Sequence, residues 1–242
     1  MGVELAGVHH AYPDGRQALR GVDLSVATGE RVAVLGPNGA GKTTLVLHLN
    51  GVLAPSAGRV SVDGLDTADK AALREIRRRV GLVFQDPDDQ LFCPTVRQDV
   101  AFGPANLGLE PDEVDARVVE ALDAVGMGAA VDRAPHHLSV GERRRVAVAT
   151  VLAMRPTTLV LDEPSANLDP ASRSELAAVL ADLDLTLVVV THDLPYALEL
   201  CPRAVVLDEG RVVADDATAA LLADADRLAA HRLALPAGLR LA

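Results

Sequence analysis

The run Gly36-Pro37-Asn38-Gly39-Ala40-Gly41-Lys42-Thr43 restricts the possible folds of this chain more than any other segment. It matches the pattern G-x-x-x-x-G-K-[ST] in full. An apolar run, Arg31 to Leu35, precedes it, and a helical pattern from about Lys42 to Asn50 follows. Glycines allow successive backbone N–H groups to point into one concavity, and the following helix offers its positive N-terminus to an anion. The segment therefore predicts a strand, a phosphate-binding loop and a helix.

Two side chains of this loop have chemistry that suits a nucleoside triphosphate. Lys42 can reach the β- and γ-phosphates, and the Thr43 hydroxyl can ligate Mg²⁺. We assign Thr44 to the same binding set. A chance glycine-rich turn is the alternative, and the complete match between a strand and a helix favours phosphate binding. The motif alone does not choose among kinases, GTPases and transport ATPases.

The rest of the chain alternates strand and helix patterns, which predicts an α/β fold with a parallel sheet. Apolar residues make up 49% and aromatics only 2%, so the core is built from Val, Leu and Ala, as in a buried parallel sheet. The predicted strands are 3–8, 16–26, 31–35, 59–62, 80–84, 158–161, 186–190, 204–207 and 211–214. The predicted helices are 42–50, 70–79, 111–125, 141–154 and 170–183, with a helical tail from Thr218.

The middle of the chain differs from the rest. Residues 86–135 contain no convincing buried strand, and Pro87, Pro94, Pro104 and Pro111 divide the stretch into short pieces. We expect one domain over 1–242. Residues 1–85 and 156–215 form its α/β core, 86–155 a helical subdomain and 216–242 a helical tail.

Composition excludes several classes of function. The formal net charge is −11, which argues against sequence-independent nucleic-acid binding. The basic runs Arg77–Arg79 and Arg143–Arg145 are interpreted as solvated helix faces. Cys93 and Cys201 are too few for a disulfide framework and fit a reducing cytosol. The start of the chain lacks a secretory pattern, and no apolar run approaches the roughly 20 residues of a membrane span, so we expect any membrane role to need a partner.

Carboxylates follow the predicted strand that ends at Leu161. Asp162 is positioned to hold Mg²⁺, and Glu163 to act as general base toward water. The alternative is a strand-end turn that caps the next helix. His192 follows the strand 186–190 at the edge of the sheet where ligands of α/β folds bind, and it can contact a γ-phosphate and orient water. A lone histidine there can also be structural.

Leu138-Ser139-Val140-Gly141-Glu142 precedes a helix and has the pattern of a capping box. It could be only a helix start, yet it resembles the signature motif of ABC ATPases, usually LSGGQ. Other residues resemble that family's remaining motifs in the correct order: Gln85 the Q-loop, Ser165–Asp169 the D-loop, His192 the H-loop, and Tyr12 the aromatic that stacks on adenine. The resemblance covers about residues 3–215.

This resemblance implies an ABC ATPase fold, with a RecA-like parallel-sheet core, an N-terminal antiparallel β subdomain and an inserted α-helical subdomain. It implies ATP and Mg²⁺ as ligands, with Thr43, Gln85 and Asp162 around the metal and Gln85 also in the catalytic set. Ser139, Gly141 and Glu142 are expected to contact ATP bound to a second, identical or paralogous, ATPase. Val140 and Glu142 depart from the usual signature, and we expect Arg143–Arg145 to offset the charge of Glu142.

The segments Val83–Phe92 and Thr95–Pro104 resemble the ATPase subunits of energy-coupling-factor importers, especially the cobalt branch. This likeness implies a transmembrane coupling subunit, a substrate-binding membrane subunit and a peripheral place on the cytoplasmic side of the cell membrane. Leu91, Phe92 and Phe102 are expected to contact the coupling subunit, with ordinary lobe packing as the alternative. Cobalt or nickel is the expected cargo, and a vitamin such as biotin is the alternative.

Three other classes of P-loop protein are less consistent with the sequence. ATPases of DNA maintenance carry a long coiled coil between the Q-loop and the signature, whereas Gln85 and Ser139 are only 54 positions apart. Translation-factor ATPases normally carry two cassettes in one chain. A small-molecule kinase has no use for the Gln85 and Ser139 motifs.

Overall fold

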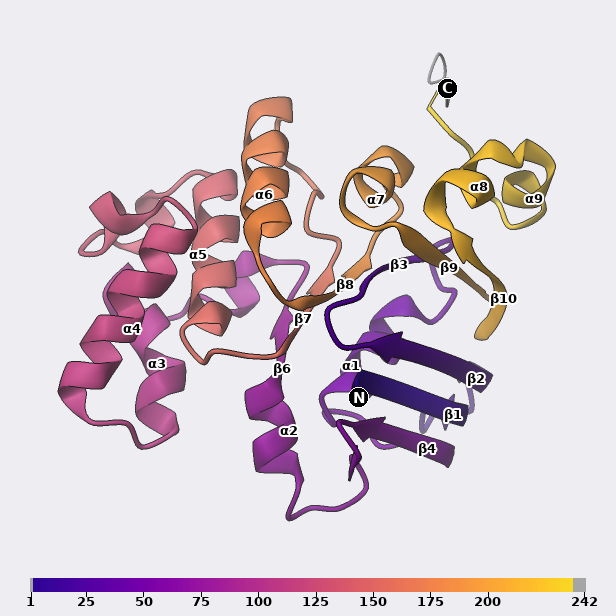
Figure 1. Ribbon diagram of the computed structural model, residues 1–242, viewed down its shortest axis with the longest axis horizontal. Helices are drawn as coiled ribbons and strands as arrows, with labels where there is room; N and C mark the ends of the chain where they lie inside the picture. Colours follow the sequence, from indigo (N-terminus) through magenta and orange to yellow (C-terminus); the bar gives the residue numbers. More distant parts are fainter. Residues whose placement is uncertain (1, 237–242) are drawn as a thin grey trace.

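A computed structural model describes residues 2–236, which fold around two β-sheets with helices on both sides (Figure 1). The larger sheet has six strands in the spatial order β10-β9-β3-β8-β7-β6. Their bounds are Arg211–Ala217 (β10), Arg203–Asp208 (β9), Arg31–Leu35 (β3), Thr186–Val190 (β8), Thr158–Asp162 (β7) and Val80–Val83 (β6). All neighbours are parallel except β10 and β9, because a turn of two residues can join only antiparallel strands. The predicted parallel α/β core is confirmed.

The central strands are mostly apolar because both faces of the sheet are covered. Every residue of β7 and β8 is buried. Successive residues of a strand point to opposite faces, so Val32 and Val34 join one apolar cluster while Ala33 and Leu35 join the other. The first cluster includes side chains of the helix that follows the phosphate loop. The other includes those of the helical lobe. Both clusters fix the carboxyl ends of the strands, where the site lies.

A second, antiparallel sheet packs beside the first, in the order β2-β1-β4-β5 (Figure 1). Its strands are Gln17–Ala27 (β2), Gly2–Ala11 (β1), Ala57–Val62 (β4) and Leu65–Asp66 (β5). The predicted antiparallel N-terminal unit is confirmed, while the two-residue strand β5 was not predicted. The backbone N–H of Arg20 donates to the Gly210 carbonyl at 2.8 Å, which joins this sheet to the β9–β10 turn.

Three helices form a lobe to one side of the sheets (Figure 1). They are α3 (Val96–Asn106), α4 (Pro111–Ala124) and α5 (Val140–Leu152). The expectation that Pro104 divides this region is wrong, because α3 continues through it. A capping box of Thr95 and Gln98 begins the helix, and Val96 and Val100 are fully buried in the lobe core. The free energy gained by this burial outweighs the loss of the backbone hydrogen bond that Pro104 removes from the last turn of α3.

The remaining helices cover the six-stranded sheet. They are α1 (Lys42–Leu49), α2 (Leu73–Arg79), α6 (Pro170–Asp182), α7 (Leu194–Leu200), α8 (Thr218–Ala223) and α9 (Ala225–Ala230), with short 3₁₀ turns at Pro87–Asp89, Gly128–Ala130 and Pro135–His137. Helix α7 was not predicted, although Asp193 accepts from the Tyr196 N–H at 2.9 Å as an N-cap. The end of the predicted tail, residues 237–242, lies outside the described residues. Within 2–236, no helix is both long and apolar enough to cross a bilayer.

Candidate active site

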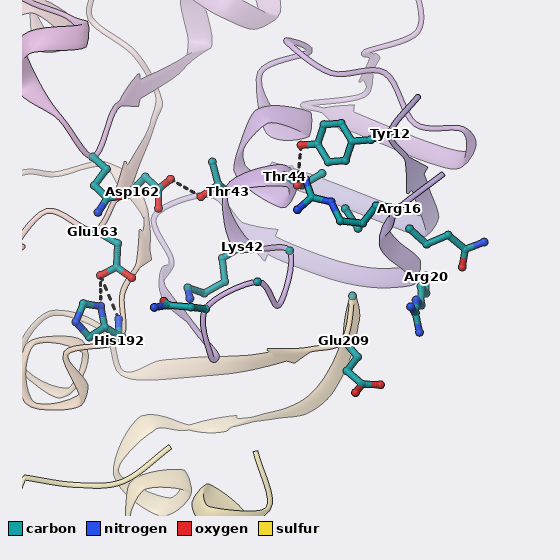
Figure 2. Close-up of a pocket in the computed structure, with 17 residues that line it drawn as sticks. Tyr12, Arg16, Arg20, Lys42, Thr43, Thr44, Asp162, Glu163, His192 and Glu209 are labelled. Carbon is teal, nitrogen blue, oxygen red and sulfur yellow. Dashed lines mark hydrogen bonds and ion pairs between the residues drawn. The ribbon is translucent and has the colours of Figure 1, made fainter. Parts of the chain in front are cut away.

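A pocket of about 740 Å³ opens where the carboxyl ends of β3 and β7 meet the first turn of α1 (Figure 2). Residues from segments far apart in the sequence line it. Those predicted as site residues are Tyr12, Asn38, Gly39, Gly41, Lys42, Thr43, Thr44, Gln85, Asp162, Glu163 and His192. Gly36, Pro37 and Ala40 belong to the same loop but do not line the cavity.

The phosphate loop needs glycine at its two ends. Gly36 and Gly41 have φ angles of 151° and 105°, in the region that L side chains rarely adopt. A Cβ atom on Gly36 would collide with the carbonyl oxygen of Leu207, and one on Gly41 with that of Ala18. The loop is therefore wedged between the β9–β10 hairpin and β2, which holds its curled backbone in place.

Lys42 is the buried cation of the pocket. Its Nζ donates to the carbonyl oxygens of Gly36 at 2.7 Å and Pro37 at 3.2 Å. Burial lowers the pKa of Lys42, while the charges of Glu163 and Asp162 act in the opposite direction. Its direct hydrogen-bond partners are neutral, so an anionic phosphate would be a stronger partner for this ammonium group.

Thr43 and Asp162 meet from two different elements. The Thr43 hydroxyl at the start of α1 donates to Asp162 Oδ2 at the end of β7, at 2.8 Å. Burial raises the pKa of Asp162, and the Thr43 hydrogen bond acts against that rise. Gln85 lines the pocket with them. Hydroxyl, carboxylate and amide oxygens are the hard donors that Mg²⁺ takes, so this set fits the ion.

Glu163 and His192 form a hydrogen-bonded pair beside the phosphate loop (Figure 2). Glu163 Oε2 lies 2.8 Å from His192 Nδ1 and accepts from the His192 backbone N–H at 3.2 Å. Glu163 has a φ of 48°, which is a strained conformation for a residue other than glycine. The Glu163 N–H donates to the Val190 carbonyl, so the backbone is held in place and the position of the carboxylate is set.

Tyr12 marks the opposite end of the pocket from His192 (Figure 2). Its hydroxyl lies 3.0 Å from Thr44 Oγ1. His10 contacts the ring edge-on at 4.9 Å between centroids, and the Arg16 guanidinium lies over the ring, 4.9 Å from its centroid. An aromatic ring can stack on a purine base through the face that the guanidinium does not cover.

Sequence reasoning missed several residues of the pocket, chiefly Arg16, Arg20, Glu209 and Gly210. Arg16 could have been found, since the turn Pro13-Asp14-Gly15 returns it to Tyr12, whose N–H donates to the Arg16 carbonyl at 3.0 Å. No sequence pattern indicated that Gly210 would lie in the pocket. It reaches the site because its N–H donates to the Ala40 carbonyl at 2.9 Å across the fold.

The signature residues Ser139, Gly141 and Glu142 do not line this pocket. They begin α5, where the Ser139 hydroxyl accepts from the Glu142 N–H at 3.2 Å and Glu142 Oε2 accepts from the Ser139 N–H at 2.7 Å. A Cβ on Gly141 would lie 2.5 Å from Ser172 Oγ, so the position requires a very small residue. Ser139 and Val140 are exposed.

The expected role of Arg143–Arg145 is wrong, because all three guanidinium groups are engaged elsewhere. Arg143 forms an ion pair with Asp88 at 3.1 Å, and Arg145 forms one with Glu175. Arg144 is buried rather than solvated, and it donates to the carbonyl oxygens of Phe84, Gln85 and Ala166. The cation beside Glu142 is Arg133, whose Nη1 lies 3.3 Å from Glu142 Oε1.

A phosphate loop, a neighbouring aspartate–glutamate pair and a strand-end histidine at one sheet edge define the class of P-loop ATPases. A family model described as ABC transporter matches residues 19–166. A Streptomyces coelicolor protein provisionally named as an ABC transporter ATP-binding protein is 66% identical over 98% of this chain and 90% of its own length. The energy-coupling factor transporter ATP-binding protein EcfA of Methanothermobacter thermautotrophicus is 49% identical over 97% of this chain and 76% of its own.

Solved structures agree with these relatives. The structure of cbiO1 from Clostridium perfringens, part of the ABC transporter complex cbiONQ, has a TM-score of 0.84 and 38% identity, covering 97% of this chain and 95% of that one. A dimeric ATP-binding cassette in a post-hydrolysis state with ADP and Pi has a TM-score of 0.80 and 30% identity, covering 89% and 98%. The chain belongs to the ABC transporter family of ATP-binding proteins. Its activity is ATP hydrolysis coupled to transport.

Proposed function

We propose that this chain is the ATP-hydrolysing subunit of an energy-coupling-factor importer that takes up a transition metal ion, cobalt or nickel. The observation that carries the proposal is the pocket, which brings Lys42, Asp162, Glu163 and His192 together at one sheet edge. The likeness to EcfA and to cbiO1 supports the transporter type. The second candidate cargo is a vitamin such as biotin, because the name EcfA specifies no cargo.

The pocket residues divide the binding of ATP between them. Tyr12 stacks on the adenine, and the loop N–H groups with Lys42 hold the β- and γ-phosphates. Thr43, Gln85 and Asp162 would hold Mg²⁺, whose charge neutralises phosphate oxygens when it is bound. Thr44 also lines the cavity, and its hydroxyl contacts the Tyr12 hydroxyl at 3.0 Å.

Hydrolysis needs a base and a group that positions the water. The Glu163 carboxylate accepts a proton from water while the water oxygen bonds to the γ-phosphorus. The bond from that phosphorus to the bridging oxygen breaks, and ADP and phosphate leave. His192 engages Glu163 Oε2, so Oε1 remains available for the proton. The same histidine orients the water or contacts the γ-phosphate, which makes it a second catalytic residue.

A second ATPase subunit completes the site. Ser139, Gly141 and Glu142 lie outside the chain's own pocket, and the exposed start of α5 presents N–H groups and a positive dipole end. In a two-fold dimer, each copy's α5 contacts the ATP held by the other. The dimeric state of the solved cassette supports this arrangement. The partner is an identical copy or a paralogous ATPase.

The proposed contact with the membrane subunit involves two of the three residues first expected. The Phe92 and Phe102 side chains are 64% and 49% exposed, and their rings meet edge-to-face at 5.0 Å between centroids. Leu91 is only 8% exposed and packs in the lobe core, so its expected contact is replaced by lobe packing. This aromatic pair binds the coupling subunit, and the chain lies at the cytoplasmic side of the cell membrane through that partner.

Uptake by cells that express the complete transporter tests the proposal. Radioactive cobalt or nickel is expected to accumulate with the natural chain, and Glu163→Gln in this chain is expected to abolish the accumulation. Accumulation of labelled biotin in place of both metals would assign the vitamin cargo. Uptake that continues undiminished with Glu163→Gln would contradict the transport role of this ATPase.

A further inference from the structure

The Glu142 carboxylate at the start of α5 is held from two sides. Its Oε2 accepts from the Ser139 N–H at 2.7 Å, and its Oε1 lies 3.3 Å from Arg133 Nη1. Arg133 Nη2 also donates to the His137 carbonyl at 2.7 Å. The guanidinium group is therefore fixed between the carboxylate and the loop that leads into α5.

Arg133 is the cation that pairs with Glu142 in the part of the chain that the structure describes. The adjacent residues Arg143–Arg145 bond instead to Asp88, to buried carbonyl groups and to Glu175, in that order. The Ser139 N–H and the nearby Arg133 lower the pKa of Glu142, so this carboxyl is ionised near neutral pH. Position 142 therefore carries a full negative charge that a glutamine would not carry.

A negative charge at this position opposes the binding of a phosphate. In the proposed dimer, the start of α5 faces the γ-phosphate of ATP bound to the partner, and two like charges at short range repel. Each copy also has a formal net charge of −11, which adds to the repulsion between copies. A fixed cation next to the carboxylate reduces the local repulsion without disturbing the capping box.

We propose that Arg133 is a positioning residue that neutralises Glu142, so that the signature helix can accept the γ-phosphate of a partner-bound ATP. This inference rests on the proposed function, because it requires the dimer in which α5 meets that phosphate. It also explains how this chain uses glutamate in a signature motif that usually has glutamine.

A double-substitution experiment on the full chain tests the inference. All variants carry Glu163→Gln, and light scattering gives the ATP concentration at which half of the chain is dimeric. Arg133→Ala is expected to raise that concentration about three- to tenfold, since a partly exposed counterion next to a phosphate is removed. With Glu142→Gln also present, Arg133→Ala is expected to change it less than about twofold, because no carboxylate then needs a counterion.

Two further variants separate charge from folding. Arg133→Gln can keep a donor for the His137 carbonyl while losing the charge, and it is expected to reproduce the effect of Arg133→Ala. Arg97→Ala removes an arginine of the same lobe that pairs with Asp115 at 3.1 Å, and it is expected to leave dimerisation unchanged. Thermal melting without nucleotide checks that every variant is folded.

Two outcomes overturn the inference while leaving the dimer intact. One is an equal loss from Arg133→Ala with and without Glu142→Gln, which would assign a purely structural role to the contact with His137. The other is no loss from Arg133→Gln. A parent chain with Glu163→Gln that stays monomeric in ATP would overturn both the proposed dimer and this inference, and it would do so before Arg133 is changed.

Discussion

The pocket beside β3 and the start of α5 both have the chemistry to hold phosphate. Only the pocket, however, is surrounded by other residues of the same chain. In the pocket, Lys42, Thr43 and Asp162 already have partners within the chain, and six separate segments surround the cavity. At α5, Ser139 and Val140 are exposed. In the proposed dimer, folding of one chain therefore builds one half of the ATP site, whereas association with a second copy completes the other half.

Lys42→Ala is expected to have the largest effect, because it removes the buried cation of the pocket. We expect ATP affinity to fall by on the order of 100-fold or more, since charge-assisted contacts to phosphate are lost. Titration calorimetry with ATP measures it. Lys70→Ala, at an exposed lysine outside the loop, is the control. Unchanged affinity in Lys42→Ala would refute the idea that the pocket is the primary ATP site.

Glu163→Gln separates binding from chemistry within the same pocket. The amide cannot accept the proton of water, so we expect kcat to fall by about 10²–10⁴-fold while ATP binding is retained. The chain should then remain dimeric in ATP during gel filtration, because the bridging phosphate is not removed. Turnover at the natural rate would eliminate Glu163 as the general base.

Tyr12→Ala tests the adenine end of the pocket. Loss of a stacking face is expected to weaken ATP binding by about tenfold, in line with 1–3 kcal/mol for a stacked base. Inorganic tripolyphosphate, which has no base, should bind the variant as well as the natural chain. Tyr12→Phe keeps the ring and loses only the bond to Thr44, so it is expected to be nearly neutral. Equal losses for both ligands would instead point to damage of the phosphate loop.

Ser139→Ala changes the exposed start of α5 and has the smallest expected effect on the isolated chain. The lost cap should cost α5 about 1 kcal/mol of stability. Thr95→Ala removes the same kind of capping box from α3 and should cost a similar amount. Only Ser139→Ala is expected to raise the ATP concentration needed for dimerisation. Matching behaviour of the two variants in light scattering would mean that Ser139 is a helix cap and nothing more.

The sequence predicted most of the fold because its patterns are local. The apolar runs at 31–35 and 186–190 became β3 and β8 at the expected residues, since a fully buried strand needs no partner information to be recognised. Helix α3 was missed because Pro104 indicates a break, whereas the burial of Val96 and Val100 decides the outcome. Such burial depends on α4 and α5 and cannot be seen in the segment itself.

The candidate site was likewise predictable from the sequence only where its chemistry depends on a short stretch of residues. The phosphate loop, Asp162 and Glu163 are recognisable because their chemistry depends on contiguous residues of one strand and one loop. Arg144 was misassigned as solvated, because its carbonyl partners come from loops about 20 and 60 residues away. A run of three arginines has the same appearance in the sequence whether its members are buried or exposed.

By itself, the sequence determined the order of the motifs and the chemistry of each, since glycine conformations, strand-end carboxylates and helix caps are properties of short stretches. Only the tertiary structure decided which charges meet. It paired Glu142 with Arg133 rather than with the adjacent arginines, and it brought Gly210 against the phosphate loop. The physical reason is that electrostatic and hydrogen-bond partners are chosen by distance in space, and that distance is set by packing of the two sheets and the lobe.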